Sequence, residues 1–379
     1  MERNPLLVLE TFGQSLWVDF IRRGMLTSGE LKQLIETDGV SGVTSNPSIF
    51  EQAIAKSNDY DMSIRALTLE GKTPEEIYQI LTVEDIQMVA DLLRPTYNRT
   101  DGRDGFVSLE VSPGLAYDTD GTLVEARRLW SLVNRPNAMI KVPATHAGIP
   151  AIQQLTGEGI NVNITLLFGL PRYREVVNAY IAGLESLAAR GKDLKQIASV
   201  ASFFLSRIDV LLDPEFEAKR LAIVPKADIA ARLPGQVAIA SAKVAYEIYR
   251  EIFGSDRFKK LADKGARTQR LLWASTSTKN PAYSDTKYVE PLIGPDTINT
   301  VPIETLTAYR DHGNPRRTLD QDVSEAYKLL AALPSLGIDL NEATEQLEQE
   351  GVKKFSEAFE RLMVSLKEKQ VGIRELAGR

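Results

Sequence analysis

The sequence predicts a (β/α)8 barrel, the TIM-barrel form of the α/β class, and three observations carry this prediction. Between residues 16 and 302, about eight short strand-like runs alternate with helix-like stretches. Alternation at this spacing is typical of a parallel sheet, and eight such strands close into a barrel. No G-x-G-x-x-G or G-x-x-x-x-G-K-[ST] motif follows any strand, which argues against the rival fold, an open nucleotide-binding sheet.

The expected strands are short runs rich in β-branched and apolar residues that stop at turns. They cover residues 16–20, 39–47, 106–113, 137–145, 160–168, 197–207, 270–278 and 297–302. The expected helices show helical spacing of apolar residues. They cover residues 26–37, 48–71, 73–99, 122–133, 148–159, 171–191 and 236–254, and the stretch after the sixth strand is a polar segment. Thr27 or Ser28 would cap the first helix, and Pro150 suits the first turn of the fifth.

From about residue 318 the pattern changes, because the stretches 319–337 and 340–369 read as amphipathic helices and no strand follows them. We therefore expect one TIM-barrel domain over residues 1–379. Its last part, residues 318–379, would be appended helices packed on the barrel.

Composition narrows the function. Hydrophobic residues make up 43% of the 379 residues and charged residues 25%, as in globular proteins. The net charge of -6 and the pI near 5.3 argue against a nucleic-acid partner, although a local basic pocket for phosphate stays compatible with them. No apolar run reaches the roughly 20 residues that span a bilayer, and the amino terminus lacks a signal pattern. We therefore expect no membrane partner and a cytoplasmic location.

The chain has no cysteine, which excludes thiolate catalysis and cysteine-ligated zinc. Its two histidines, His146 and His312, have no metal-ligand partner at a useful spacing and are expected in loops. The sequence therefore predicts neither a metal nor a cofactor.

Candidate active-site residues lie at the carboxyl ends of the strands, where barrel enzymes place their chemistry. They are Asp19, Thr44, Ser45, Asn46, Glu110, Lys141, Asn163, Thr165, Ser202, Arg207, Ser275 and Ser277. Lys141 stands out because a lysine in an apolar strand must be paired, neutral or functional. A buried neutral amine is a nucleophile suited to Schiff-base formation. The alternative is a lysine that reaches solvent or pairs with Glu110.

Two carboxylates near an amine are what carbinolamine chemistry requires, and Asp19 and Glu110 fill that requirement unless they only form internal salt bridges. Asn163 and Thr165 are two residues apart and therefore share one face of their strand. The threonine could hold a catalytic water against Glu110 and the asparagine could bind substrate hydroxyls. Alternatively, both are polar filler of the barrel interior.

A phosphate-binding pair is expected at the sixth strand, where Arg207 follows Ser202 and an arginine can offer paired donors to phosphate oxygens. The alternative is a surface Arg207 paired with Asp209. Asn46 lies in a polar turn at the end of the second strand, and its alternative is an ordinary Asn-Pro turn.

Three ordered segments resemble the signature segments of transaldolases: GVTSNPSIF (42–50), MIKVPAT (139–145) and NVNITLLF (161–168). The segments LWVDF, VSLEVSP and SFFLSRID fall in the expected order around them. The resemblance covers about residues 10–315, and three ordered motifs on separate strands are highly specific.

The resemblance implies a class I aldolase-type barrel that needs no cofactor, with Lys141 as the Schiff-base residue. Glu110 would shuttle protons with Thr165 through a water, and Asp19 would be the acid/base for carbon–carbon cleavage. The substrate-binding residues implied are Asn46, Asn163 and Ser202 for the dihydroxyacetone unit and Arg207 for the phosphate. The implied reaction moves that unit between sedoheptulose 7-phosphate and glyceraldehyde 3-phosphate, giving erythrose 4-phosphate and fructose 6-phosphate in the non-oxidative pentose phosphate pathway.

One departure concerns the phosphate site. Many family members carry an arginine two residues after a serine that follows the seventh strand, but here Ser275 is followed by Ser277 at that place. Lys279, two residues further on, either substitutes for the arginine or leaves the phosphate with less charge around it. The long tail resembles the longer form of the family.

Two other functions stay open at this point. One is a Schiff-base aldolase that releases free dihydroxyacetone, and the other is a non-catalytic barrel that binds sugar phosphates. Sugar phosphates are the expected partners in each case, and the sequence is compatible with either a monomer or a homodimer.

Overall fold

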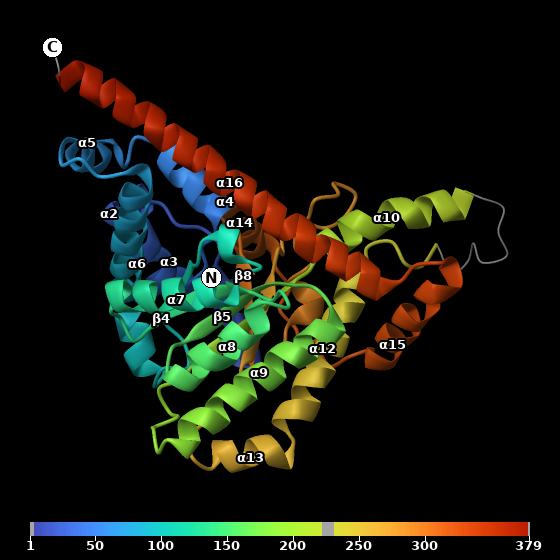
Figure 1. Cartoon of the computed structure of the whole chain (residues 1–379). Coiled ribbons are helices and arrows are strands. Elements are labelled where there is room, and N and C mark those ends of the chain that lie inside the picture. The colour runs from blue at the N-terminus through green and yellow to red at the C-terminus, as the bar shows by residue number, and fades with distance from the viewer. Residues whose placement is uncertain (1–3, 222–230, 378–379) are drawn as a thin grey trace.

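A closed barrel of eight parallel strands forms the centre of the computed structural model, which describes residues 4–221 and 231–377. The strands follow one another around the barrel in chain order, and β8 pairs with β1 to close it (Figure 1). They are β1 (Gln14–Val18), β2 (Val40–Val43), β3 (Phe106–Glu110), β4 (Ala138–Pro143), β5 (Val162–Leu167), β6 (Ser199–Phe204), β7 (Arg270–Ala274) and β8 (Thr297–Val301). The predicted TIM barrel is confirmed.

Helices surround this barrel and extend beyond it (Figure 1). They are α1 (Pro5–Leu9), α2 (Arg23–Thr27), α3 (Glu30–Asp38), α4 (Pro47–Phe50), α5 (Asp61–Leu69), α6 (Pro74–Arg99), α7 (Thr119–Val133), α8 (Gly148–Glu158), α9 (Leu170–Ala189), α10 (Ser206–Leu221), α12 (Val237–Phe253), α13 (Asp256–Ala262), α14 (Ile303–His312), α15 (Val323–Ala332) and α16 (Leu340–Ala377). Local sequence explains their starts: Thr73 and Glu76, for example, form a reciprocal capping box at the start of α6.

Several predicted boundaries were wrong. The helix expected over 26–37 is divided into α2 and α3 at Gly29, whose φ of +84° breaks the helical path. The helix expected over 48–71 is three pieces: α4, a π-helical turn (Glu51–Ala55) and α5. The strand expected over 197–207 ends at Phe204, so Arg207 lies in the first turn of α10 and not on the strand. The polar segment after it contains α10, and residues 222–230 lie outside the described residues.

The register of the sheet brings the predicted residues to one level of the barrel. Glu110 of β3 pairs with Lys141 of β4, and Lys141 pairs with Asn163 of β5. Residues in register on neighbouring strands point to the same face of the sheet. These three side chains therefore project inward together.

The amphipathic helices predicted after residue 318 are confirmed as α15 and α16. The second of these, α16, has 38 residues. In Figure 1 this helix runs across one end of the barrel, from the side of α10 to that of α5. Ion pairs fix it at both ends: Glu348 with Arg172 (3.2 Å) and Lys369 with Asp61 (2.8 Å). Its apolar face is buried, so α16 covers the end of the barrel where the strands finish.

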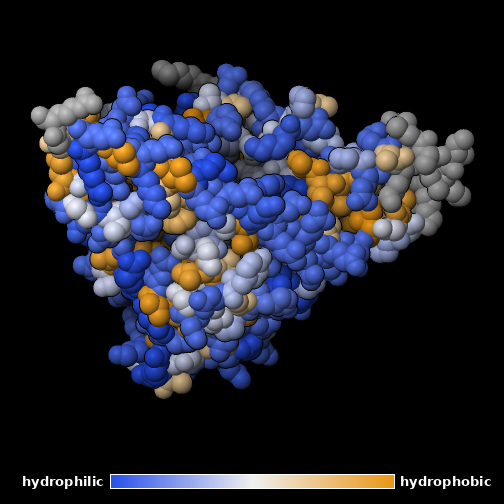
Figure 2. All heavy atoms as spheres, turned by 45° about the horizontal axis from the view of Figure 1, so that its top comes forward, coloured by the Kyte–Doolittle hydropathy of each residue, from blue (hydrophilic) through white to orange (hydrophobic). Residues whose placement is uncertain are grey.

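The face turned forward in Figure 2 is mainly hydrophilic, and its hydrophobic side chains gather in separate patches. Within residues 4–221 and 231–377, no helix is both long and apolar enough to cross a bilayer.

Candidate active site

A cavity of about 370 Å³ lies at the carboxyl ends of the strands. Parallel strands bring the residues that follow them to this one end, so distant segments meet here. The predicted residues that line the cavity are Asp19, Thr44, Asn46, Lys141, Ser202, Arg207, Ser275, Ser277 and Lys279. Glu110, Asn163 and Thr165 lie buried in the strands β3 and β5, which flank β4.

Lys141 is buried in β4 with only 3% of its surface exposed. Its Nζ donates a hydrogen bond to the carbonyl oxygen of Ser45 (3.0 Å) and forms an ion pair with Glu110 Oε2 (3.1 Å). The pairing with Glu110 that the sequence left open as an alternative therefore exists. It does not exclude chemistry, because Lys141 also faces the cavity.

Glu110, the acidic partner of Lys141, is buried as well. Burial raises the pKa of its carboxyl above the usual range, and the nearby Lys141 charge opposes that rise. Neither carboxyl oxygen has an aligned hydrogen bond within the described residues, and the same holds for the buried Thr165 hydroxyl. Buried polar groups are nearly always satisfied, if necessary by an ordered water. The two groups thus suit a water held between Glu110 and Thr165.

Asp19 follows β1 and accepts a hydrogen bond from Thr44 Oγ1 (2.6 Å), which also bonds to Thr300 Oγ1 (2.8 Å). Burial raises the pKa of the Asp19 carboxyl, while Lys141 and the Thr44 hydrogen bond lower it. A carboxyl held in this way can both accept and return a proton.

Asn163 lies at the centre of a polar network inside the barrel. Its amide nitrogen donates to Ser108 Oγ (2.8 Å), and its amide oxygen accepts from Ser202 Oγ (2.7 Å). Asn46 has two uses, because its side-chain oxygen accepts from the backbone nitrogen of Ile49 (3.0 Å) while the residue lines the cavity. The Asn-Pro turn and the contribution to the cavity therefore coexist at Asn46.

Arg207 lies against two aromatic rings, with its guanidinium carbon 5.4 Å from the Phe204 centroid and 5.9 Å from that of Phe355. The predicted alternative, a pair with Asp209, is wrong: that carboxyl accepts hydrogen bonds from the backbone nitrogen of Ala238 and from Tyr288 Oη, both 2.9 Å. Arg207 makes no ion pair within residues 4–221 and 231–377, and its buried Nη1 has no hydrogen-bond partner there. It is a cation with free donors, as an anion site requires.

The segment after β7 provides the rest of the predicted phosphate region. Ser275 adopts a left-handed backbone conformation (φ +54°), and its hydroxyl lies 2.9 Å from that of Ser206 at the start of α10. Lys279 is exposed at the edge of the cavity and forms no ion pair in the described part of the chain. Ser277 also lines the cavity, so the position of the missing arginine does face this site.

Phe355 of α16 is one of several cavity residues, Glu304 of α14 among them, that sequence reasoning missed. Phe355 is 3% exposed, and its ring centroid lies 5.9 Å from Lys141 Nζ. Nothing local distinguished it, because an apolar residue of an amphipathic helix normally belongs to the core. Thr44, in contrast, was visible as a strand-end residue, although its hydrogen bond to Asp19 was not.

His146 lies in the loop after β4, as expected, whereas His312 is the last residue of α14 and not a loop residue. His146 Nδ1 contacts Arg172 Nη1 (2.8 Å), and His312 is exposed between Asp285 and Asp311, whose carboxylates raise its pKa. Within the described residues, no group of three or more histidine, aspartate and glutamate side chains is placed to hold a metal ion.

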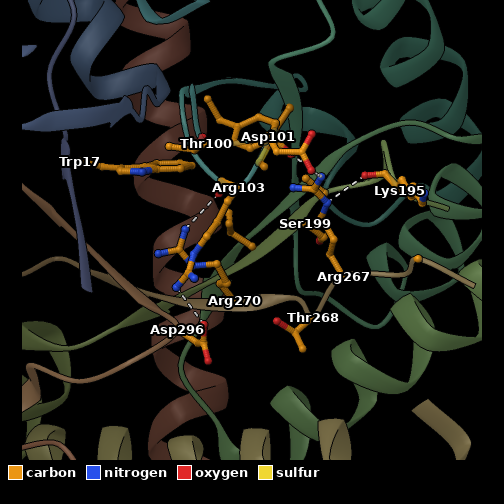
Figure 3. Close-up of a pocket in the computed structure, with 16 residues that line it drawn as sticks. Trp17, Thr100, Asp101, Arg103, Lys195, Ser199, Arg267, Thr268, Arg270 and Asp296 are labelled. Atoms are coloured by element: carbon orange, nitrogen blue, oxygen red, sulfur yellow. Dashed lines mark hydrogen bonds and ion pairs between the residues drawn. The ribbon is translucent and has the colours of Figure 1, made fainter. Parts of the chain in front are cut away.

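A larger cavity of about 560 Å³ opens among the loops that precede β3, β6, β7 and β8. Figure 3 shows the arginines of this cavity engaged with neighbouring groups. Arg103 pairs with Asp296 (2.9 Å), Arg267 with Asp101 (3.6 Å), and Arg270 with Asp104. Paired charges of this kind at the amino ends of barrel strands, away from the end where barrel enzymes place their chemistry, fit a role in stability. Size alone therefore does not decide between the two cavities, and it is the cavity at the carboxyl ends of the strands that contains the free donors of Arg207.

A buried lysine flanked by two carboxyls at the carboxyl end of a (β/α)8 barrel defines a barrel enzyme of the class I aldolase type. Comparisons with known proteins agree. The transaldolase/fructose-6-phosphate aldolase family model matches residues 16–366. The chain is 49% identical to transaldolase 2 of Nostoc sp. over 97% of this chain and 98% of that protein.

It is also 49% identical to the transaldolase of Thiobacillus denitrificans, over 93% of this chain and 97% of that one. Transaldolase 1 of Streptomyces coelicolor is 48% identical, over 93% and 92%. The chain belongs to the transaldolase/fructose-6-phosphate aldolase family. The family predicted from the sequence motifs is thereby confirmed.

Proposed function

We propose that this cavity carries out transaldolase chemistry, with Lys141 as the Schiff-base residue and sugar phosphates as substrates. The observation that carries the proposal is that Lys141, buried and paired with Glu110, faces the same cavity as the free donors of Arg207. An amine nucleophile and a phosphate receptor in one cavity fit a phosphorylated ketose. The donor is sedoheptulose 7-phosphate or fructose 6-phosphate, and the acceptor is glyceraldehyde 3-phosphate or erythrose 4-phosphate.

The first half of the reaction uses the Lys141–Glu110 pair. Because burial raises the pKa of Glu110, a substrate that fills the cavity and displaces water favours transfer of one proton from Lys141 to Glu110, which leaves both groups neutral. The free amine then attacks C2 of the ketose. Glu110 returns its proton, through the water at Thr165, to the hydroxyl that leaves as water. A cationic imine remains on Lys141.

The second half uses Asp19. Its carboxylate accepts the proton of the C4 hydroxyl, the C3–C4 bond breaks, and its electrons enter the imine to form an enamine. The aldose phosphate departs while the three-carbon unit stays on Lys141. Addition of C3 to the aldehyde carbon of the acceptor reverses these steps, and Asp19 gives its proton to the new hydroxyl. Asn46, Asn163 and Ser202 bind the hydroxyls of the three-carbon unit.

Phosphate binding is assigned to Arg207, with Ser275 beside it and Lys279 at the edge of the cavity as the second cation. This assignment rests on the free donors of Arg207 and on the absence of an ion pair for Lys279 within the described residues. Lys279 is exposed and flexible in length, so it suits a charge contribution more than a fixed hydrogen bond.

Borohydride trapping with fructose 6-phosphate tests the proposal. Reduction should fix the three-carbon unit on the peptide that contains Lys141, and Lys141→Ala should abolish the adduct. Lys243→Ala is the matched control, because Lys243 is another buried lysine but donates to the carbonyls of Thr318 and Gln321, away from the cavity. An adduct that persists in Lys141→Ala, or none in the parent protein, would overturn the proposal.

The domain organisation, the location and the oligomeric state of the protein are also proposals. We treat residues 1–379 as one domain, because α16 supplies a cavity residue from the appended part. The proposed location is the cytoplasm. Monomer and homodimer both stay compatible with the fold.

A further inference from the structure

The end of the cavity above Lys141 is closed by the carboxy-terminal helix α16. Phe355 of this helix lines the cavity and is itself buried. Its ring centroid lies 5.9 Å from Lys141 Nζ and 5.9 Å from the guanidinium carbon of Arg207. One apolar ring therefore lies beside both the carbon-carrying amine and the phosphate-binding cation.

The backbone of α16 packs so closely on the barrel at Gly351 that a larger residue would not fit without a shift. Gly351 lies one turn before Phe355, and a Cβ there would lie 2.8 Å from Leu166 Cδ2 and 3.4 Å from Arg207 Nη1. Leu166 itself follows Thr165 on β5 and has a left-handed backbone (φ +53°). Since Gly351 and Phe355 are four residues apart, both lie on the side of α16 that faces the barrel, and Phe355 lines the cavity there.

From this geometry we infer that Phe355 determines the fate of the bound three-carbon unit by excluding water from the Lys141 adduct. This inference rests on the proposed function and deepens it. Transfer and release compete for the same enamine. In transfer, C3 of the enamine forms a bond with the acceptor aldehyde, whose oxygen takes a proton. In release, C3 takes a proton, water adds to C2 of the resulting imine, and the C2–N bond breaks to give dihydroxyacetone and the free amine.

Release needs water at C2 before an acceptor has reacted. Transfer needs water only after the new C–C bond has formed, to hydrolyse the imine of the product ketose. A wall that keeps water from C2 while the enamine waits for its acceptor therefore favours transfer. An aromatic ring serves this purpose because it is large, apolar and offers no group that could activate water. A ring beside the cationic imine also stabilises its charge, as it does that of an ammonium.

The test is the partition of the adduct between release and transfer. With fructose 6-phosphate as donor and erythrose 4-phosphate as acceptor, one measures free dihydroxyacetone and sedoheptulose 7-phosphate in the same reaction. Phe355→Ala should raise the ratio of release to transfer on the order of tenfold, because water then reaches the imine. Phe355→Leu keeps an apolar wall and should stay within about threefold of the parent protein.

Phe359→Ala is the matched control. Phe359 lies one turn further along α16 and packs edge-on against Tyr78 (centroids 5.2 Å apart), and it does not line the cavity. Its removal costs helix packing of the same kind but should leave the ratio unchanged. Thermal melting of all three variants shows whether each is folded, and Phe355→Leu keeps the test usable if the alanine variant unfolds.

Two results would overturn the inference. One is an unchanged ratio in a folded Phe355→Ala that only raises KM for fructose 6-phosphate, which would make Phe355 a support for Arg207. The other is an equal rise in Phe359→Ala, which would mean that loosening α16 anywhere opens the site. In both cases a borohydride-trapped Lys141 adduct still forms, so failure of the inference is distinct from failure of the proposed function.

Discussion

Arg207→Ala removes the partly buried cation of the cavity whose donors are free, and this makes the loss of phosphate binding calculable. A hydrogen bond to a charged group contributes about 1.5–3 kcal/mol, and a guanidinium can give two to one phosphate. Water and Lys279 replace part of the loss. We therefore expect a net cost of about 3 kcal/mol in transition-state stabilisation, which lowers kcat/KM about 100-fold. This loss should appear only with a phosphorylated substrate, because Arg207 is proposed to bind the phosphate and not the sugar.

The assay compares two donors, fructose 6-phosphate and unphosphorylated fructose, in the parent protein and in Arg207→Ala. With fructose 6-phosphate, kcat/KM should fall about 100-fold. With fructose it should change by no more than about threefold, because the lost donors have no phosphate to bind. An equal fall with both donors would refute the reasoning, since it would show that Arg207 shapes the site without binding phosphate.

Two further variants locate the charge. Arg207→Lys keeps the charge but loses the planar fork, so it should recover only part of the activity with fructose 6-phosphate. Lys279→Ala removes an exposed charge that solvent screens, and it should cost no more than about fivefold. A Lys279→Ala effect that equals the Arg207→Ala effect would mean that both cations hold the phosphate directly.

Two more predictions concern buried carboxyls. Glu110→Gln removes the proton carrier beside Lys141, so the Lys141 adduct should form about 100-fold more slowly while the fold is unchanged. Rapid-quench borohydride trapping measures this rate, and a near-normal rate would mean that another group shuttles the proton. Burial raises the pKa of Asp209 to about 6. A carboxyl raised in this way favours the folded state below its unfolded pKa near 4, and this contribution is lost as the pH rises through about 6. Denaturant titrations should therefore show the parent losing about 3 kcal/mol relative to Asp209→Asn between pH 4 and 8, and parallel pH profiles would contradict the assignment.

The barrel could be predicted because its signals are local. Strand-like runs and their turns are visible in short windows, and the register that brings Glu110, Lys141 and Asn163 to one level follows from parallel strands. The boundaries were less predictable. The sixth strand was predicted to reach Arg207 because no glycine or proline marks its end, although the strand ends at Phe204 and the chain turns into α10 at Ser206.

The contribution of α16 could not be predicted for a different reason. Phe355 is more than 200 residues from Lys141 in the sequence, and its contact with the cavity depends on how the whole helix crosses the barrel. Tertiary placement of this kind leaves no trace in a local pattern. The sequence also could not decide whether Asn46 belongs to an ordinary Asn-Pro turn or to the site, because its side chain caps α4 and the residue also lines the cavity.

The net charge of the chain, -6, does not describe the charge of the cavity. Lys141, Arg207 and Lys279 face the cavity, while burial raises the pKa of both Asp19 and Glu110 and so disfavours their charged forms. The cavity thus places three cationic side chains beside the carboxyls of Asp19 and Glu304, so a phosphate group finds cations there although the chain as a whole is acidic. Because Arg207 is also partly desolvated, its attraction for phosphate is screened less by salt than that of an exposed cation. An acidic protein can in this way hold an anionic substrate, because Arg207 keeps free donors in the cavity while Arg103 and Arg270 are paired with carboxylates at the other end of the barrel.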